Sequence, residues 1–325
     1  MSSRNGREML KGLSIGVLYG GPSSEREVSI ESGENVSKAL SAAGHEVHRV
    51  LLDDSFTAKD ARALGIDIAF LALHGEFGED GRIQSILEEA DIPYTGSGID
   101  ASSQAFDKML AKQAFERCNV RTPAWMCLDV ADLDKTGGAQ GLYLVPPLVV
   151  KPATGGSSLG ITIVRSESQV VPAISKASEY GDSILIERYI KGRELTVGVL
   201  GDAALPVAEL ELAGEFYDYH AKYSDDRTRI VCPANLDTET ALRVQALGLA
   251  AHRALGCRDV SRTDVILDDA GMAWVLEVNT LPGMTSHSLL PRGAAAVGKS
   301  FAELCEELLA LSLTRAMSTH AHPAL

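Results

Sequence analysis

The first hundred residues alternate short apolar runs with longer stretches of helical composition. Apolar runs at residues 13–19, 46–52 and 67–73 predict buried strands, and a helix is expected from about 101 to 117. Regular alternation of strands and helices is typical of a parallel α/β domain. The pattern therefore predicts that the chain begins with such a domain, and the proline at Thr122-Pro123 suits the start of another.

The middle of the chain changes to paired short strands. An apolar run between prolines at 146–152 is followed by a loop of small residues at 153–160. Further strands are predicted at 161–164 and 183–187, with one helix from 168 to 180 between them. Hairpin strands beside a single helix predict an antiparallel α+β unit.

The last third continues this pattern and ends in a polar tail. Strands are expected at 193–200 and 204–212, a helix at 238–255, a strand hairpin at 261–267 and 273–279, and a final helix at 301–313. A tyrosine-rich loop at 215–225 interrupts the strands. The tail at 314–325 lacks apolar periodicity, so we expect it to be loose.

Three oxygen-bearing side chains lie close together in the predicted hairpin. Because side chains alternate across a strand, Glu277 and Asn279 share one face while Val278 lies on the other. Asp264 on the neighbouring strand would supply a second carboxylate. Mg²⁺ prefers oxygen ligands, usually one or two carboxylates with nucleotide phosphates. The hairpin therefore predicts a magnesium site, whereas any one of these residues alone would more often lie on a solvated strand face.

Length, charge and cysteine usage narrow the class of protein. A chain of 325 residues suits two or three domains, and its net charge of −14 argues against non-specific binding to nucleic acid or to an anionic membrane. Five scattered cysteines without a C-x-x-C spacing predict reduced thiols rather than disulfides or a zinc site. The apolar run at 13–19 is too short for a signal peptide or a membrane span. We therefore expect a soluble, cytoplasmic protein without nucleic-acid or membrane partners.

Two glycine-containing segments match the chemistry of phosphate binding. Gly293–Ser300 satisfies the P-loop pattern G-x-x-x-x-G-K-[ST], but that mechanism requires a buried strand directly before the loop. Leu289-Leu-Pro-Arg292 precedes it instead, so we interpret the match as coincidental. The loop Gly155–Gly160 is a better candidate, because small residues let the backbone approach polyphosphate and Lys151 supplies a positive charge. Alone, such a loop would more often be the tip of a hairpin.

Other charged residues would complete a nucleotide cleft around this loop. Lys108 lies on the preceding domain, and Glu187 and Glu194 lie on predicted strands, although the two carboxylates could equally be solvated. Near the N-terminus, Glu25 and His74 follow predicted strands, where ligands bind in parallel α/β sheets. A lone histidine is more often structural than catalytic, so the pattern by itself does not single out His74.

Motifs that occur in order along the chain carry a resemblance to a known family. They are Gly20-Gly-Pro-Ser-Ser-Glu-Arg-Glu-Val-Ser29, Leu73-His-Gly75 with Gly78-Glu-Asp-Gly81, Tyr94-Thr-Gly-Ser97, Lys151-Pro-Ala-Thr-Gly-Gly-Ser-Ser-Leu-Gly160, Phe216-Tyr-Asp-Tyr-His-Ala-Lys-Tyr223 and Glu277-Val-Asn-Thr-Leu-Pro-Gly-Met-Thr-Ser-His-Ser288. Together they resemble D-alanine:D-alanine ligase of the ATP-grasp superfamily over about residues 13–312. Such an ordered set is far more specific than any one of its members.

The resemblance implies a fold, a reaction and partners. The fold would be a three-domain ATP-grasp structure of α/β and α+β regions: an N-terminal parallel α/β domain at 1–106, a central lid domain at 107–193 and a C-terminal domain at 194–325. ATP would phosphorylate the carboxylate of one D-alanine, and the amine of a second would attack the acyl phosphate, giving D-alanyl-D-alanine for peptidoglycan synthesis. The implied cofactors are ATP and two Mg²⁺ ions, with Mn²⁺ as an alternative, and the implied assembly is a homodimer through the N-terminal domain.

The resemblance also assigns roles to individual residues. Glu25 would hold the ammonium of the first D-alanine, Ser157 and Tyr223 would hydrogen-bond to it and close the site, and His74 would lie beside this substrate. The tetrahedral intermediate would be stabilised by Arg262 and the N–H of Gly283, and the carboxylate of the second D-alanine would be received by Ser288, the N–H of Leu289 and Lys222. The ATP-binding set would be Lys108, Lys151, Ser157, Ser158, Glu187, Glu194 and Lys222, and the metal ligands would be Asp264, Glu277 and Asn279.

Alternatives remain open at this point. His220 lies in the loop at 217–223 that is expected to close over the site, and a histidine there changes charge near neutral pH. A D-alanyl-D-lactate ligase or another D-amino-acid dipeptide ligase of the same superfamily would fit, although the Lys222-Tyr223 pair favours D-alanine as second substrate. A nucleotide-binding regulator without turnover would be favoured by loss of Arg262 or of a metal ligand, and none of these is lost.

Overall fold

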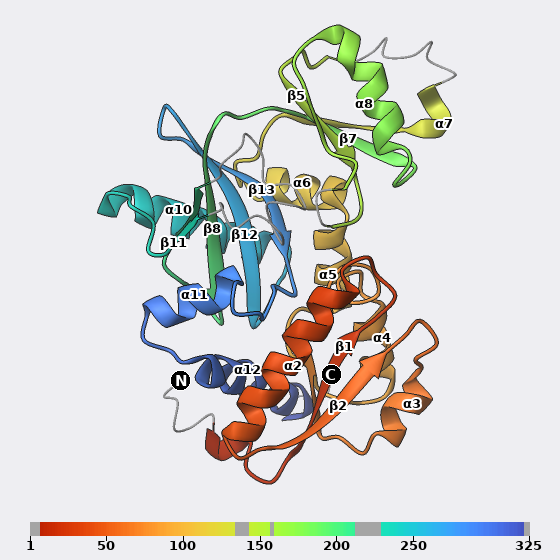
Figure 1. Ribbon diagram of the computed structural model, residues 1–325, viewed down its shortest axis with the longest axis vertical. Helices are drawn as coiled ribbons and strands as arrows, with labels where there is room; N and C mark the ends of the chain where they lie inside the picture. Colours follow the sequence, from red (N-terminus) through yellow and green to blue (C-terminus); the bar gives the residue numbers. More distant parts are fainter. Residues whose placement is uncertain (1–6, 134–142, 157–158, 212–228, 322–325) are drawn as a thin grey trace.

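Three β-sheets follow one another through the computed structural model, which describes residues 7–133, 143–156, 159–211 and 229–321. The N-terminal sheet lies at one end of the long axis, the sheet of the middle region at the other, and the largest sheet between them (Figure 1). The mixture of parallel and antiparallel sheets confirms the predicted α/β and α+β fold class. None of the helices in the described ranges is long and apolar enough to span a membrane.

The N-terminal sheet is parallel, as predicted, with strand order β2–β1–β3. All four residues of β3 and most of β1 are buried, and strands covered on both faces are almost continuously apolar, which is why short runs identified these two; β2 at the edge of the sheet is largely exposed. The elements are β1 (Ser14–Gly20), α2 (Arg26–Ala42), β2 (Glu46–Leu52), α3 (Ala58–Ala63), β3 (Ile68–Leu71) and α4 (Arg82–Glu89).

The single helix expected at 101–117 is wrong, because the chain breaks there into α5 (Ile99–Phe106) and α6 (Lys108–Arg117). Asp107 separates them with φ −90° and ψ 106°, and its Oδ1 accepts the N–H groups of Met109 at 2.9 Å and Leu110 at 3.2 Å. Aspartate favours this N-cap geometry over a helix interior. The break redirects α6 towards the middle sheet, where Lys108 N donates to Ala153 O at 2.8 Å.

The middle sheet is antiparallel with order β4–β7–β5–β6, as predicted for this region. One helix, α8, packs on it through Val170, Ala173, Ile174 and Ala177, whose spacing places them on one helical face. The elements are β4 (Trp125–Asp129), α7 (Val130–Leu133), β5 (Leu148–Pro152), β6 (Thr162–Val164), a 3₁₀ turn (Glu167–Gln169), α8 (Val170–Ala177) and β7 (Ser183–Arg188).

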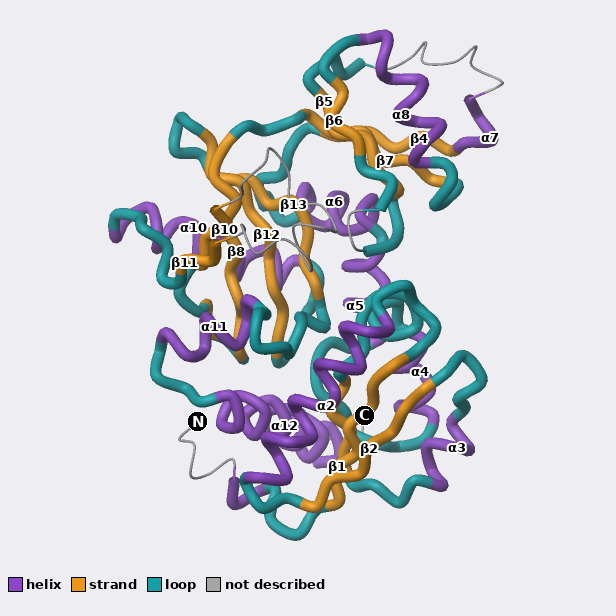
Figure 2. The backbone as a smooth tube through the Cα atoms, viewed as in Figure 1, coloured by secondary structure: helices purple, strands orange, loops and turns teal. Residues whose placement is uncertain are grey.

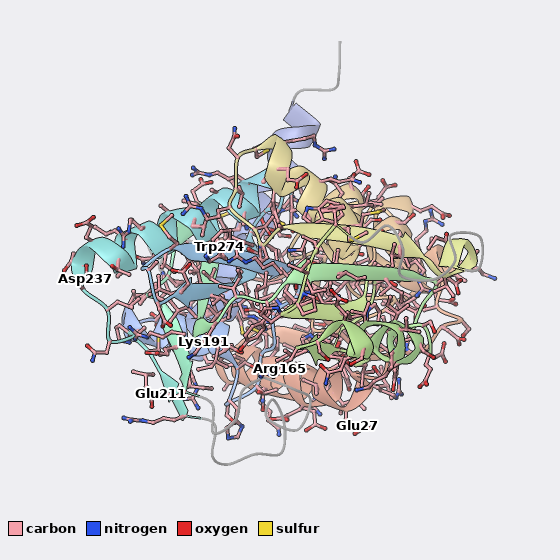
Figure 3. The ribbon with its side chains drawn as sticks, turned by 90° about the horizontal axis from the view of Figure 1, so that it is seen from above. Glu27, Arg165, Lys191, Glu211, Asp237 and Trp274 are labelled. Carbon is pink, nitrogen blue, oxygen red and sulfur yellow. The ribbon has the colours of Figure 1, made fainter. Side chains whose placement is uncertain are left out.

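The largest sheet is antiparallel, with order β11–β10–β8–β12–β13 and β9 paired to β8. Its elements are β8 (Gly192–Leu200), β9 (Ala203–Ala204), β10 (Ala208–Glu211), β11 (Arg229–Val231), α10 (Thr238–Ala254), β12 (Val260–Asp268) and β13 (Ala273–Asn279). Helix α10 lies close against β8, since a Cβ at Gly248 would come within 2.7 Å of Val197. Seen from above, Trp274 of β13 lies within the outline of the molecule, whereas Asp237, the N-cap of α10, lies at its edge (Figure 3).

The expected loose tail at 314–325 is wrong for residues 314–321, because α12 runs without interruption over Phe301–Ala321. This helix returns to the N-terminal sheet and packs beside α2 (Figure 2), with Leu304, Leu308 and Leu309 buried in the shared core. At its far end, Arg315 forms an ion pair with Asp259 and donates to Tyr94 O at 2.8 Å. Tertiary contacts therefore order a segment whose own periodicity is weak.

The P-loop-like segment at 293–300 is not a phosphate loop, as we inferred. A helix that the sequence did not indicate, α11 (Leu289–Ala296), includes Gly293, so no strand leads directly into the segment. Lys299 Nζ lies 2.5 Å from Glu307 Oε2 and lines neither of the cavities described below. The match to the pattern is coincidental.

Replacing Arg315 with methionine is expected to destabilise the protein by about 3 kcal/mol, because it leaves a buried carboxylate without its cation. The Asp259 side chain is only 7% exposed. Chemical denaturation would measure the loss. The matched control is Arg243→Met, which removes an exposed pair with Glu239 and should cost less than about 1 kcal/mol. Equal losses in the two variants would contradict a structural role for the end of α12.

Candidate active site

A cavity of about 240 Å³ lies where the three sheets approach one another. Its walls come from the loops after β1 and β3, the start of α6, the loop after β5, and the hairpin β12–β13 with the turn that follows it. Ten residues predicted from the sequence line it: Glu25, His74, Lys108, Lys151, Arg262, Glu277, Asn279, Gly283, Ser288 and Leu289. Tertiary structure thus assembles residues that are up to 264 positions apart in the sequence, from Glu25 to Leu289.

A second cavity of about 120 Å³ adjoins the first and shares Lys151, Ile161, Glu277 and Leu289 with it. The remaining predicted residues that the structure describes line this second cavity: Glu187, Glu194 and Asp264. The other predicted residues, Ser157, Ser158, His220, Lys222 and Tyr223, lie outside the described residues, as does the loop 217–223.

The pairing register of the hairpin β12–β13 positions the predicted metal ligands. Asp264 lies opposite Glu277, and Arg262 lies opposite Asn279. Arg262 binds Asp264 with both arms of its guanidinium, Nε to Oδ1 at 2.9 Å and Nη2 to Oδ2 at 2.8 Å. Thr196 Oγ1 on the adjacent strand also donates to Asp264 Oδ1, at 2.9 Å. Arg262 therefore lies directly beside Asp264, one of the predicted metal ligands.

The buried side-chain oxygen of Asn279 is suited to bind a cation. Its Oδ1 is buried and accepts no hydrogen bond from any described residue. A buried acceptor without a partner costs free energy, and a hard cation would satisfy it. Within the described ranges, no three histidine, cysteine, aspartate or glutamate side chains gather around one point. Two carboxylates and one amide oxygen fit an ion that takes its remaining ligands from phosphate and water.

The turn at residues 280–284, which follows β13, is held by side chains of the N-terminal region. His74 Nδ1 lies 3.0 Å from Leu281 O, and its Nε2 lies 3.0 Å from Ser32 Oγ, which accepts the N–H of Met284 at 3.2 Å. A carbonyl only accepts, so Nδ1 carries the proton. Burial lowers the pKa of His74, which leaves Nε2 as an acceptor for the Ser32 hydroxyl. This relay fixes the backbone around Gly283.

Glu79 is a cavity residue that sequence reasoning missed. Its side chain is buried, and Oε2 accepts the N–H of Gly75 at 2.6 Å. It also interacts with the backbone of Leu281, so it holds the turn 280–284 from another side. Burial and the neighbouring Glu25 raise the pKa of Glu79 to about 8, so this carboxyl is protonated at neutral pH. The feature of the sequence that pointed to Glu79 was its position in the Gly78–Gly81 motif.

Glu25 is enclosed by backbone from two regions of the chain. A Cβ at Gly75, where φ is +69°, would lie 2.9 Å from Glu25 Oε2, and one at Gly156 would lie 2.6 Å from the same atom. Side chains at these positions would displace the carboxylate, which explains why glycine suits both. The glycine loop after β5 thus lies directly against the N-terminal acid.

The loop after β5 is also bound from α6. Lys108 Nζ donates to Gly155 O at 2.6 Å, and Lys151 Nζ lies 2.5 Å from Glu187 Oε1. Glu187 has a second cation, Lys112, at 2.7 Å from its Oε2. Although burial opposes ionisation, the two lysines lower the pKa of Glu187 to about 2. Lys112 was also missed, and its position one helical turn after Lys108 was the available signal.

Ser288 and Leu289 begin α11 beside the cavity. Ser288 Oγ accepts the N–H of Thr285 at 3.0 Å, and a Cβ at Gly283 would lie 2.6 Å from the same oxygen. Leu289 is the first helical residue, and the first N–H groups of a helix have no partner within the helix. Such an N-terminus suits an anion such as a carboxylate.

A parallel α/β region beside two antiparallel sheets, with lysines and carboxylates facing the cleft between those sheets, defines the ATP-grasp fold. Family models described as the N-terminus and the C-terminus of D-ala D-ala ligase match residues 54–97 and 120–310. A D-alanine–D-alanine ligase from an Anaeromyxobacter species is 44% identical over 301 residues, which cover 92% of this chain and 96% of that one. The chain belongs to the D-alanine–D-alanine ligase family.

Solved structures agree with this membership. The VanG D-Ala:D-Ser ligase from Enterococcus faecalis superposes with a TM-score of 0.82 at 29% identity, covering 93% of this chain and 100% of that one. A D-alanine–D-alanine ligase from Bacillus anthracis complexed with ATP superposes with a TM-score of 0.79 at 34% identity, covering 94% and 99%.

The raised pKa of Glu79 predicts that the stability of the protein depends on pH. Its pKa of about 8 lies above the ordinary 4.5, so its contribution to stability is complete below about pH 4.5 and is lost as pH rises through 8. Glu79→Gln keeps a neutral side chain of the same shape and removes this titration. Between pH 6 and 9 the thermal midpoint of the unchanged protein is expected to fall more steeply than that of the variant.

The matched control is Glu76→Gln, which changes an exposed carboxyl of the same loop. Its midpoint should follow that of the unchanged protein across the pH range. Parallel curves for all three proteins would show that Glu79 does not titrate as inferred.

Proposed function

We propose that this chain is an ATP-dependent D-alanine–D-alanine ligase that forms D-alanyl-D-alanine through D-alanyl phosphate and serves peptidoglycan precursor synthesis. One observation carries the proposal: the enclosed acid Glu25, the lysines beside the glycine loop, and the Arg262 hairpin all line one continuous space. Those are the groups that an ammonium, a polyphosphate and a developing oxyanion require.

For the first step, Glu25 would bind the ammonium of the first D-alanine, and His74 would lie beside it. Lys108 and Lys151 would bind phosphates over the glycine loop, with Glu187 and Glu194 completing the nucleotide site. The close approach of Gly156 to Glu25 supports this arrangement, because it brings the loop against the acid that orients the substrate. Holding a carboxylate near the terminal phosphate lowers the entropic part of the barrier.

For the second step, the amine of another D-alanine would attack the acyl phosphate. Ser288 and the N–H of Leu289 would bind its carboxylate, and the α11 N-terminus supports that role. Arg262 and the N–H of Gly283 would stabilise the oxyanion of the tetrahedral intermediate. Because His74, Ser32 and Glu79 hold the turn 280–284, the Gly283 N–H needs little reorganisation during the reaction.

Asp264, Glu277 and Asn279 would hold Mg²⁺, or Mn²⁺ in its place, and two ions are proposed. When bound, the metal would neutralise negative charge on the phosphates. The unpartnered Asn279 Oδ1 supports its inclusion in the set. Ser157, Ser158, Lys222 and Tyr223 would complete the site from segments outside the described residues.

We further propose a homodimer through the N-terminal region, a cytoplasmic location, and domains at 1–106, 107–193 and 194–325. The five cysteines are all free thiols, which suits a reducing compartment. Three separate sheets support the division into domains, with α12 of the C-terminal segment packing back against the N-terminal region.

Incubation with ATP, Mg²⁺ and D-alanine is expected to release phosphate and D-alanyl-D-alanine in equal amounts. D-Serine and D-lactate, offered in competition, should give less product, and L-alanine none. Phosphate release with mass spectrometry of the product would measure this. Folded protein that binds ATP but forms no dipeptide would refute the proposal. If the main product instead joins D-alanine to D-serine or to D-lactate, the chain is a ligase with a different second substrate.

Arg262→Ala is expected to lower kcat by about 10²- to 10³-fold, because an oxyanion donor is lost, while ATP still binds. Steady-state kinetics and calorimetric ATP binding would measure the two effects. Arg193→Ala is the control, since it removes a comparable arginine–carboxylate pair, with Glu209, from the same sheet outside both cavities. Equal turnover in the two variants would exclude Arg262 from the reaction.

A further inference from the structure

Lys112 is a lysine of α6 whose side chain is completely buried, with 0% of its surface exposed. Burial of an ammonium group is costly unless opposite charge and hydrogen bonds compensate it, and burial lowers the pKa of Lys112. A protein can dispense with such a group by placing an apolar residue there. Its presence one helical turn after Lys108, paired with Glu187 in the wall of the second cavity, therefore calls for an explanation.

Lys112 joins two sheets through its contacts. Its Nζ lies 2.7 Å from Glu187 Oε2 on β7 of the middle sheet and donates to Thr122 Oγ1 at 2.6 Å. Thr122 Oγ1 in turn donates to Val275 O on β13 at 2.8 Å. The same side chain thus touches the middle sheet directly and the strand of Glu277 and Asn279 through one hydroxyl.

Glu187 is shared between Lys112 and Lys151. Each of its oxygens has its own lysine, at 2.7 Å and 2.5 Å respectively. Both lysines also experience attraction from Glu277. Without Lys112, the buried Glu187 carboxylate would have Lys151 as its only described cation, and a buried one-to-one ion pair is held tightly because separation leaves two unpaired charges. Lys151 would then be less able to serve a phosphate.

We propose that Lys112 is a positioning residue for nucleotide binding: it neutralises Glu187, so that Lys151 remains available to phosphate, and it ties this pair to β13. The inference rests on the proposed assignment of Lys151 to the ATP site. It predicts that Lys112 influences the affinity for ATP without contacting the nucleotide.

Lys112→Met removes the charge while keeping an unbranched side chain, and Lys112→Arg keeps the charge. With full-length protein and Mg²⁺, calorimetry should show ATP binding to the Met variant weakened by about tenfold or more, because a charge-assisted contact is lost. The KM for D-alanine should change less than about twofold, and Lys112→Arg should recover most of the affinity. Thermal unfolding would identify a temperature at which every variant is folded.

A double substitution separates positioning from a merely structural role. Because Glu187 is itself assigned to the nucleotide site, the double variant is compared with Glu187→Gln alone. If the unneutralised Glu187 restrains Lys151, then Lys112→Met should weaken ATP binding less in the Glu187→Gln background than in the unchanged protein, so the two effects would be non-additive. An equal weakening in both backgrounds would overturn the proposal, and so would an equal loss of affinity for ATP and D-alanine.

Two further variants distinguish failure of this inference from failure of the proposed site. If Lys151→Met binds ATP as tightly as the unchanged protein, the nucleotide site itself is assigned wrongly. If Lys151→Met loses affinity while Lys112→Met does not, only the role of Lys112 is refuted. Lys299→Met is the control, because it removes a lysine–glutamate pair outside both cavities and should leave ATP affinity unchanged.

Discussion

The pairing register of β12 with β13 is the constraint on which the rest of the site depends. It places Asp264 opposite Glu277 and Arg262 opposite Asn279, and a slip of one residue would turn Glu277 and Asn279 to the opposite face. The register shifts between Asp264 and Val265, a β-bulge of the kind common next to active sites. Beyond the bulge, Trp274 Nε1 donates to Asp268 Oδ2 at 2.8 Å and stabilises the closed end of the hairpin.

The turn after this hairpin connects the site to the N-terminal region. Leu281 and Met284 are bound by His74 and Ser32, and Glu79 interacts with Leu281 as well. These contacts join backbone groups to neutral side chains, so they avoid the desolvation cost of buried ions. The cavity-lining residues of the large sheet are thereby held against Glu25 and its surroundings, which belong to the N-terminal region.

Two buried glutamates show how neighbours decide ionisation in this site. Glu79 lies near another acid, so burial and repulsion raise its pKa to about 8, whereas two lysines lower the pKa of Glu187 to about 2. Glutamate therefore serves as a neutral hydrogen-bonding group in the wall of the first cavity, at Glu79, and as a fixed anion in the wall of the second cavity, at Glu187. Neither state could be assigned from residue type, because both follow from contacts between distant segments.

The sequence by itself determined the class of each sheet, most strand positions and ten of the residues around the first cavity, because apolar periodicity and ordered motifs are local properties. It did not indicate the break at Asp107, the helix α11 or the extension of α12 to Ala321. Only the tertiary structure decided these, since capping, packing on another sheet and the Arg315–Asp259 ion pair override weak local preference. Lys112 and Glu79 were missed for the same reason: their roles follow from partners that are distant in the sequence.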